Sequence, residues 1–420
     1  MPNPSMVEPA PFPPGATEPH VVRVLDVTKF YAAVSGGVKT YLDAKMADFA
    51  GRPVSHSLVI PCETDAEEMI GRTRVHRVRG PVVPVSPRYR FLTDEAALRR
   101  IVMQERPHVI EVGSPFLVPV LVRRATRGLG IRTVGFYHSD LVRTYAEPYV
   151  RHRIAAPARV VLRSAARELI KRVYRRFDVT VAASQAVAAE LRSLGIRDVR
   201  CVPLGVDLDL FAPVDDGGAL RRRLWVPDGV PIALYAGRLC SEKRLDVLVE
   251  AHASIPEPQR PFLAMVGDGR LRTWLMERSG RQRRLAILPF VADRAELARL
   301  YGGADFYIAP GPGETFGLSI AEAMACGLPV VAVASGAAPD RIDQSGCGRL
   351  YAHGDAQSCA SAIQAMSGML GPRLGAAARR HAERAFSWRT TFDALCDIYA
   401  ELVASPGAVR DTGPVATMPE

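Results

Sequence analysis

Short apolar runs alternate with helical patterns along most of the chain, and this alternation limits the fold more than any other feature. It is the signature of parallel α/β units. The expected strands of a first series lie at 21–27, 54–61, 108–112, 133–137, 179–183 and 199–203. A second series follows at 232–235, 262–266, 286–290, 305–308 and 330–334. Two such series predict an α/β protein with two doubly wound domains.

The domain boundaries follow from where this pattern breaks. The chain of 420 residues is long enough for two full cores, and a turn-rich linker at 213–218 separates the two series. We expect a first domain over 20–212, a second over 213–387, and a last helix with an apolar stripe over 388–404. The ends at 1–19 and 405–420 are rich in proline and glycine and are expected to be disordered.

Residues 313–322 hold two glutamates, Glu314 and Glu322, with seven residues between them. Prolines and glycines at 309–313 preclude a helix there, and Thr315 is a capping-type residue before an apolar helical pattern. Glu314 would precede the helix, and Glu322 would lie about two turns inside it, with the carboxylates roughly 10 Å apart. The unpaired amides of the first turn predict an anion site between them.

This segment resembles the two-glutamate motif of the retaining glycosyltransferases of family 4. These enzymes have two Rossmann-like domains that face each other across a cleft, the GT-B fold. The resemblance extends from about residue 21 to about 404 and implies that the last helix crosses back to the first domain. It assigns Glu314 to the donor hexose and Glu322 to the ribose. The implied ligands of the diphosphate at the helix start are Thr315, Phe316, Gly317 and Leu318. Two solvated glutamates on a buried helix are the alternative.

The loop at 237–244 follows an expected strand at the position where open α/β sheets bind ligands. Its cations Arg238 and Lys243 are five residues apart around a tight loop, so both can converge on one dianion. The loop matches the family pattern except at Arg244, where glycine is usual. The resemblance implies that Arg238 and Lys243 neutralise the departing diphosphate. Two exposed loop cations are the alternative.

Three further candidates lie at strand ends. The pair Gly36 and Gly37 follows the first strand, where glycines let backbone amides approach a ligand closely. His138 follows the strand at 133–137, and Gly267 follows the strand at 262–266. In the resembling family these positions border the donor phosphate, the donor sugar and the nucleotide base, respectively. Ordinary turn glycines and a structural histidine are the alternatives.

The net charge of +10 comes largely from one segment. Between Arg143 and Phe177, ten basic residues face two acidic ones, and on a helix they form a cationic stripe opposite an apolar stripe. One interpretation is a helix buried on one side and solvated on the other. The alternative is that residues 151–177 dock on an anionic membrane surface. Nucleic acid is not expected, because no aromatic residues are interleaved along the cationic stripe.

The cysteines and the apolar runs bear on the compartment. Seven cysteines without a Cys-x-x-Cys pair indicate free thiols in a reducing compartment. No apolar run approaches the ~18 residues that cross a bilayer. The sequence predicts a cytoplasmic protein, free or peripheral at the inner face of the membrane. Asp207 and Asp209 have the spacing of a metal clamp but lie at the domain junction, so neither a metal nor a cofactor is expected.

These features together predict a retaining, metal-independent hexosyltransferase. It would move a hexose from a nucleotide-diphosphate sugar to a hydroxyl acceptor. GDP-mannose is preferred over a UDP-sugar as donor. The cationic helix favours a lipid-linked glycan or polysaccharide precursor as acceptor. Two alternatives stay open: a nucleotide-sugar epimerase, which would convert the donor alone, and a non-catalytic nucleotide-sugar-binding protein.

Overall fold

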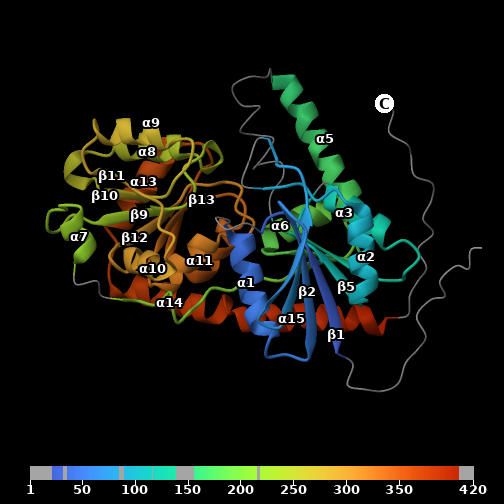
Figure 1. The fold of residues 1–420 in the computed structure, drawn as a ribbon. Coiled ribbons are helices and arrows are strands. Elements are labelled where there is room, and N and C mark those ends of the chain that lie inside the picture. Colours follow the sequence, from blue (N-terminus) through green and yellow to red (C-terminus); the bar gives the residue numbers. More distant parts are fainter. Residues whose placement is uncertain are drawn as a thin grey trace, which may run out of the picture.

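The computed structural model describes residues 21–31, 36–84, 89–115, 117–138, 156–214 and 218–405. Figure 1 shows two α/β units side by side, with helices on both faces of each sheet. Apart from Ser405, the tails expected at 1–19 and 405–420 lie outside the described residues.

The first sheet has eight strands in the order β3-β4-β2-β1-β5-β6-β7-β8. All neighbours pair in parallel except β3 and β4, which are antiparallel. The strands are β1 (Val22–Val27), β2 (Val54–Cys62), β3 (Ala66–Ile70), β4 (Thr73–Arg79), β5 (Val109–Val112), β6 (Arg132–Tyr137), β7 (Val179–Ala182) and β8 (Val199–Cys201). The helices are α1 (Gly37–Phe49), α2 (Glu95–Glu105), α3 (Leu117–Ala125), α5 (Ala156–Tyr174) and α6 (Gln185–Ser193).

The hairpin of β3 and β4 at the edge of this sheet was not predicted. Its outer strand carries Glu67 and Glu68 and has no apolar run, so the apolar pattern gave no signal. Charged residues on an edge strand are a common protection against pairing with another chain. Here Glu68 forms an ion pair with Arg77 of β4.

The second sheet has six parallel strands in the order β11-β10-β9-β12-β13-β14. The strands are β9 (Ile232–Ala236), β10 (Phe262–Val266), β11 (Leu285–Leu288), β12 (Phe306–Ala309), β13 (Val330–Val333) and β14 (Gly348–Tyr351). The helices are α7 (Ala219–Arg223), α8 (Leu245–Ser254), α9 (Arg272–Ser279), α10 (Arg294–Gly302), α11 (Leu318–Ala325), α12 (Ala338–Ser345), α13 (Ala356–Ser367) and α14 (Pro372–Ala385). Two largely parallel sheets confirm the predicted architecture.

The last helix, α15 (Trp388–Ala404), crosses back and packs on α1, β1 and β5 of the first sheet, as predicted (Figure 1). The crossing is fixed by backbone contact, because the N–H of Val206 donates to the carbonyl of Phe386 over 2.8 Å. A glycine is needed beside it. A Cβ atom at Gly205 would lie 2.3 Å from the backbone N of Trp388.

Helix α5 stands away from the first domain along its N-terminal half (Figure 1). Its buried side chains lie near its end, at Ile170 and Tyr174, followed by Phe177. Two members of the expected apolar stripe are instead exposed: Val161 by 68% and Leu169 by 42%. The interpretation of a helix buried along one side therefore holds only for its last turns.

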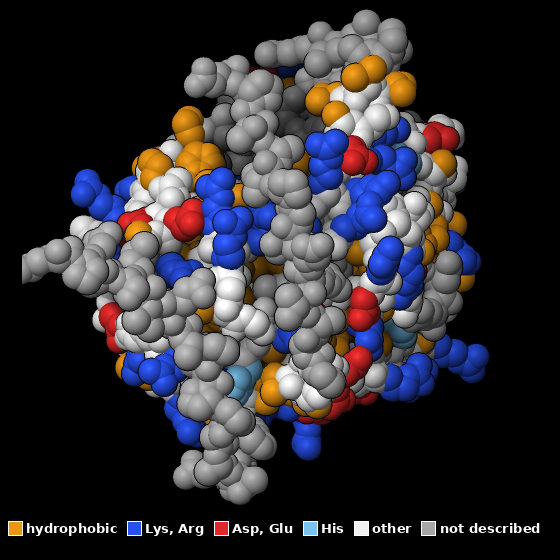
Figure 2. All heavy atoms as spheres, turned by 90° about the vertical axis from the view of Figure 1, so that its right-hand side faces the viewer, with side chains coloured by type: hydrophobic (Ala, Val, Ile, Leu, Met, Phe, Trp, Pro, Cys, Tyr) orange, Lys and Arg blue, Asp and Glu red, His pale blue; other side chains and the backbone are white. Residues whose placement is uncertain are grey.

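Figure 2 views the molecule from the side that carries α2, α3 and α5 and shows many Lys and Arg side chains beside exposed hydrophobic ones. Of the basic residues expected in this region, Arg143, Arg151 and Arg153 lie outside the described residues, and so does the side chain of Arg159. Along the described part of the chain, no helix combines the length and the apolar character that crossing a bilayer requires.

In both sheets the order reverses beside a central strand, and open α/β sheets bind ligands at the carboxyl ends of such strands. In the first sheet this point lies between β1 and β5, and in the second it lies between β9 and β12. Gly36 and Gly37 follow β1, Arg238 and Lys243 follow β9, and Glu314 follows β12, whereas His138 and Gly267 follow the neighbouring strands β6 and β10.

The close approach at Gly205 predicts the effect of a side chain there. Gly205→Ala should lower the free energy of unfolding by at least about 2 kcal/mol, because the backbone of Trp388 must move. Gly280→Ala is the control. Gly280 has φ −65°, and the nearest atom to a Cβ added there would be 3.6 Å away, so alanine fits without strain. Urea unfolding measures both variants. Equal stabilities would contradict the packing described at the crossing.

Candidate active site

Lys243 and Glu314 meet at the switch point of the second sheet. Lys243 ends the loop after β9, Glu314 follows β12, and their side chains form an ion pair. Both are partly buried, with 22% and 21% of the side chain exposed. Gly311 lies beside the pair, since a Cβ atom added at Gly311 would lie 3.0 Å from Cδ of Lys243. The loops after two neighbouring strands thus form one charged centre.

Arg238 lies on the same loop as Lys243 but has a different partner. Its guanidinium pairs with Glu242, and 61% of the side chain is exposed. Arg244, where the family usually has glycine, adopts φ 51°. Glycine reaches this left-handed conformation more easily. The loop therefore keeps a glycine-like backbone despite the substitution.

Gly267 supports this loop from the neighbouring strand β10. It has φ 154°, and a Cβ atom added at Gly267 would lie only 2.0 Å from the carbonyl oxygen of Gly237. The N–H of Leu239 donates to the carbonyl of Asp268 over 2.9 Å, which joins the two loops. The need for glycine at this position is explained by the packing of backbone on backbone.

Helix α11 begins later than the sequence predicted. Its first residue is Leu318 and its N-cap is Gly317, with φ 79°. Thr315 does not cap it, and Glu322 is therefore its fifth residue, little more than one turn inside. The Thr315 hydroxyl instead donates to the carbonyl of His138 in the first domain over 2.7 Å. Because the first amides of a helix have no intrahelical partner, the predicted anion site would lie later in the chain, at the helix start at Leu318.

Glu322 is 3% exposed. Arg294 Nη2 donates to its carboxylate over 2.7 Å, and the Tyr301 hydroxyl donates over 3.4 Å. Burial raises the pKa of Glu322, and Arg294 opposes that rise. Arg294 was not predicted. It directly follows Asp293, which caps α10 just after β11, so its position at the carboxyl edge of the sheet could have indicated it.

The first domain contributes the start of α1 and His138. A Cβ atom added at Gly37 would lie 3.8 Å from Cδ2 of Leu318, so the glycine turn of Gly36 and Gly37 faces the start of α11. The His138 ring stacks on Phe136 with centroids 4.0 Å apart. Burial lowers the pKa of His138 to about 3, so its imidazole is neutral at pH 7.

Two further contacts between the domains come from α12 and were not predicted. The buried Arg341 guanidinium donates to the carbonyl of Phe316 over 3.3 Å and to that of Ala183 over 3.0 Å. The Asp340 carboxylate accepts from the N–H of Ala186 over 3.0 Å. The domains therefore touch directly beside the start of α11.

Of the predicted residues, the structure brings two groups together. Lys243 pairs with Glu314, Thr315 of the second domain bonds to His138 of the first, and Leu318 lies beside Gly37. Arg238 and Glu322 have other charged partners, and Phe316 is buried under Arg341. The arrangement combines a cation, a carboxylate and a helix start at the boundary between two domains, which suits an anionic ligand with a polar extension.

Residues 230–368 match the family described as Glycosyl transferases group 1, and residues 35–210 match Glycosyltransferase Family 4. The GDP-mannose-dependent alpha-mannosyltransferase of Mycobacterium tuberculosis is 32% identical over 80% of this chain and 85% of its own length. This chain belongs to the group 1 glycosyltransferases of family 4. The GDP-mannose-dependent alpha-(1-6)-phosphatidylinositol dimannoside mannosyltransferase of the same species is 29% identical to this glycosyltransferase, over 93% of the chain and 100% of its own length.

The fold of the glycosyltransferase is also that of solved structures. Sucrose-phosphate synthase of Thermosynechococcus elongatus superposes with a TM-score of 0.74, covering 91% of this chain and 99% of that one at 22% identity. The predictions of a glycosyltransferase and of the GT-B fold are confirmed.

The low pKa of His138 predicts a dependence of stability on pH. The folded pKa lies below the ordinary value of 6.5, so between about pH 6.5 and pH 3 the unfolded chain binds the proton and the folded chain does not. Acidification over this range therefore destabilises the fold. Between about pH 7 and about pH 5, the free energy of unfolding of His138→Asn should fall by roughly 2 kcal/mol less than that of the parent. Urea unfolding at both pH values measures this, and equal losses would contradict the lowered pKa of His138.

Proposed function

We propose that this glycosyltransferase moves mannose from GDP-mannose to a hydroxyl of a lipid-linked glycan, retaining the anomeric configuration and using no metal ion. The names of two relatives support the donor, since both include GDP-mannose, and one also includes a phosphatidylinositol dimannoside. The observation that carries the site is the meeting of Lys243 and Glu314 beside the start of α11.

In this proposal the Lys243–Glu314 pair is replaced when the donor binds. A diphosphate carries more negative charge than one carboxylate and competes for the Lys243 ammonium. Glu314 is then released to accept hydrogen bonds from hydroxyls of the sugar. Binding of the diphosphate and of the hexose is thereby coupled through one ion pair.

The remaining residues act on the same donor. Arg238 swings from Glu242 to the diphosphate, and the first amides of α11 at Leu318 meet it from the other side. Glu322, held by Arg294, takes the ribose hydroxyls, and Gly267 borders the base. His138 is neutral and lies opposite the start of α11, so it contacts the sugar without adding a charge.

The reaction needs no covalent nucleophile from the protein in this scheme. The acceptor hydroxyl enters on the face from which the diphosphate leaves, and an oxygen of the departing phosphate takes its proton. Cations and amides that are already in place stabilise the charge that develops on the leaving group. The glycine turn of Gly36 and Gly37 borders the acceptor on the other wall.

The acceptor part of the proposal rests on α5. Its exposed part carries Val160, Val161 and Leu162 together with Arg163 and Arg167. Apolar and cationic side chains exposed on one protruding helix match the interfacial region of an anionic bilayer. We place the glycosyltransferase at the inner face of the cytoplasmic membrane, held by this helix.

The donor assignment predicts strong losses in two variants. Lys243→Ala and Glu314→Gln should each reduce turnover of GDP-mannose by at least about a hundredfold, because each removes a group in place for the departing donor. Arg283→Ala is the control, since it removes a surface cation that pairs with Glu257 in the same domain. Release of GDP is measured with and without a mannosylated lipid acceptor. Near-parental rates in both site variants would remove the assignment, and release that never depends on acceptor would contradict transfer.

The membrane assignment predicts a local effect of charge. Arg163→Gln with Arg167→Gln should weaken binding to vesicles containing phosphatidylinositol by about thirtyfold, at about 1 kcal/mol for each lost charge. Arg281→Gln with Arg283→Gln makes the same change of net charge on the second domain and should leave binding near the parental value. Co-sedimentation measures both. Equal losses in the two pairs would contradict docking through α5.

A further inference from the structure

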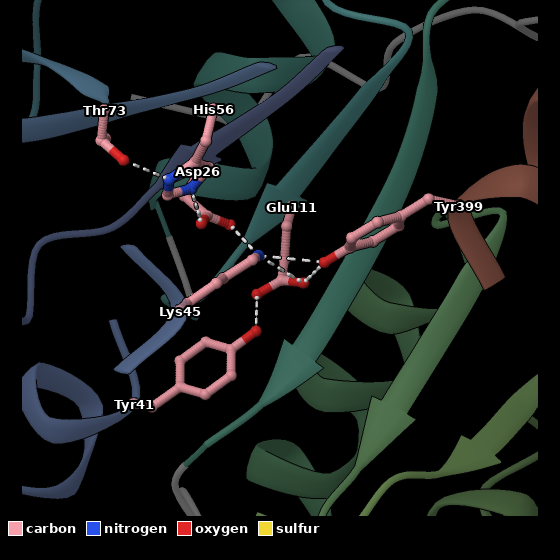
Figure 3. A network of polar contacts seen from close by, with 7 residues as sticks. All are labelled: Asp26, Tyr41, Lys45, His56, Thr73, Glu111 and Tyr399. Atoms are coloured by element: carbon pink, nitrogen blue, oxygen red, sulfur yellow. Dashed lines mark hydrogen bonds and ion pairs between the residues drawn. The ribbon is translucent and has the colours of Figure 1, made fainter. Parts of the chain in front are cut away.

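A group of buried polar side chains lies inside the first domain, around the ammonium of Lys45 (Figure 3). Its Nζ lies 2.9 Å from Oδ1 of Asp26 on β1 and 3.3 Å from Oε2 of Glu111 on β5. It also donates to the hydroxyl of Tyr399 on the crossing helix α15 over 3.0 Å. Three elements far apart in the sequence thus share one cation.

Other side chains complete the hydrogen bonds of the two carboxylates. The Tyr399 and Tyr41 hydroxyls each donate to Glu111, the latter over 2.7 Å. His56 Nε2 lies 2.6 Å from Oδ2 of Asp26. His56 is the donor of this hydrogen bond, because a carboxylate can only accept. We call this group the Lys45 network; its members are Asp26, Tyr41, Lys45, His56, Thr73, Glu111 and Tyr399.

Stability alone gives little reason for such a group. Burial opposes the charge of Lys45, and the carboxylates of Asp26 and Glu111 raise its pKa against that effect. Buried ion pairs are often no more stabilising than apolar side chains of similar size, but they demand one defined geometry. The Lys45 network therefore points to a need for accurate placement of the elements that it joins.

Those elements form one wall of the active site. Helix α1 begins at the turn of Gly36 and Gly37, and Tyr41 lies one turn further along. The ring centroid of Tyr41 is 5.0 Å from that of His138 and 6.0 Å from that of Phe392 on α15. Tyr41 is thus in contact with His138 at its ring and with Glu111 at its hydroxyl.

We infer that Lys45, Glu111 and Tyr399 are positioning residues of the transfer reaction. The hydroxyl of Tyr399 fixes the Glu111 carboxylate, and Glu111 and Lys45 fix α1. Tyr41 then holds the His138 ring against Phe136, and the glycine turn is held opposite Leu318. Because α15 follows the second domain in the chain, this wall is tied to the segment that connects the two domains. The inference rests on the proposed function for its kinetic part only.

The kinetic test removes one hydroxyl. In Tyr399→Phe, kcat for transfer should fall at least about tenfold, while KM for GDP-mannose changes by less than about twofold, since the residues assigned to the diphosphate, the ribose and the base lie in the other domain. Tyr351→Phe is the control, because Tyr351 is also buried but belongs to the core of the second domain and not to the Lys45 network. A parental kcat in Tyr399→Phe overturns the inference.

A double variant separates positioning from folding. Lys45→Met alone leaves two buried carboxylates without their cation, whereas Lys45→Met with Glu111→Gln keeps the net charge of the buried group. We expect the double variant to have a melting temperature close to that of the parent but a kcat still reduced at least about tenfold. Recovery of kcat together with the melting temperature would show a structural network only and overturns the inference.

A readout without substrate keeps this inference distinct from the proposed function. In Tyr399→Phe, backbone amides in the first turns of α1 should exchange hydrogen at least about tenfold faster, and in Tyr351→Phe they should not. Unchanged exchange in α1 overturns the inference whatever the donor is. A parent enzyme that never releases GDP from GDP-mannose contradicts the proposed function and leaves the exchange experiment to decide on the network.

Discussion

The ion pair between Lys243 and Glu314 joins the two loops that leave the second sheet on either side of its switch point. Everything assigned to the donor is arranged around it. Gly267 packs beneath the first loop, α11 follows the second, and the domain boundary lies at Thr315 and Leu318. In the proposed function, a ligand group that binds either side chain strongly releases the other, so the pair would couple the binding of a charged and of a neutral part of one ligand.

The first domain meets this centre with groups of a different character. His138 is held neutral by burial, and α1 presents a glycine turn rather than a charged side chain. The charged groups of the Lys45 network lie deeper in the first domain, where they connect α1 and β5 to the crossing helix. The wall that we propose for the donor thus carries charged side chains, whereas His138 and the glycine turn on the opposite wall carry none. This division would suit a diphosphate on one wall and a sugar between the two.

The sequence predicted the two sheets well because their central strands are apolar runs, buried on both faces. It missed β3 and β4, whose alternating charges have no apolar run, and the short edge strand β14, whose sequence is Gly-Arg-Leu-Tyr. It placed the start of α11 at Thr315, but Gly317 provides the left-handed turn that decides the start. The partner of Glu322 was missed because Arg294 is 28 residues away and meets it only through folding. Exposure of Val161 depends on where α5 leaves the domain, which periodicity does not encode.

The central claim is that Lys243 and the start of α11 bind a diphosphate. Calorimetry with GDP and with guanosine measures it directly, because the difference between the two binding free energies is the contribution of the diphosphate. In the parent this difference should be several kcal/mol, and in Lys243→Ala it should shrink by about 1.5–3 kcal/mol while guanosine binds as before. A difference that is the same in the parent and in Lys243→Ala would contradict the account.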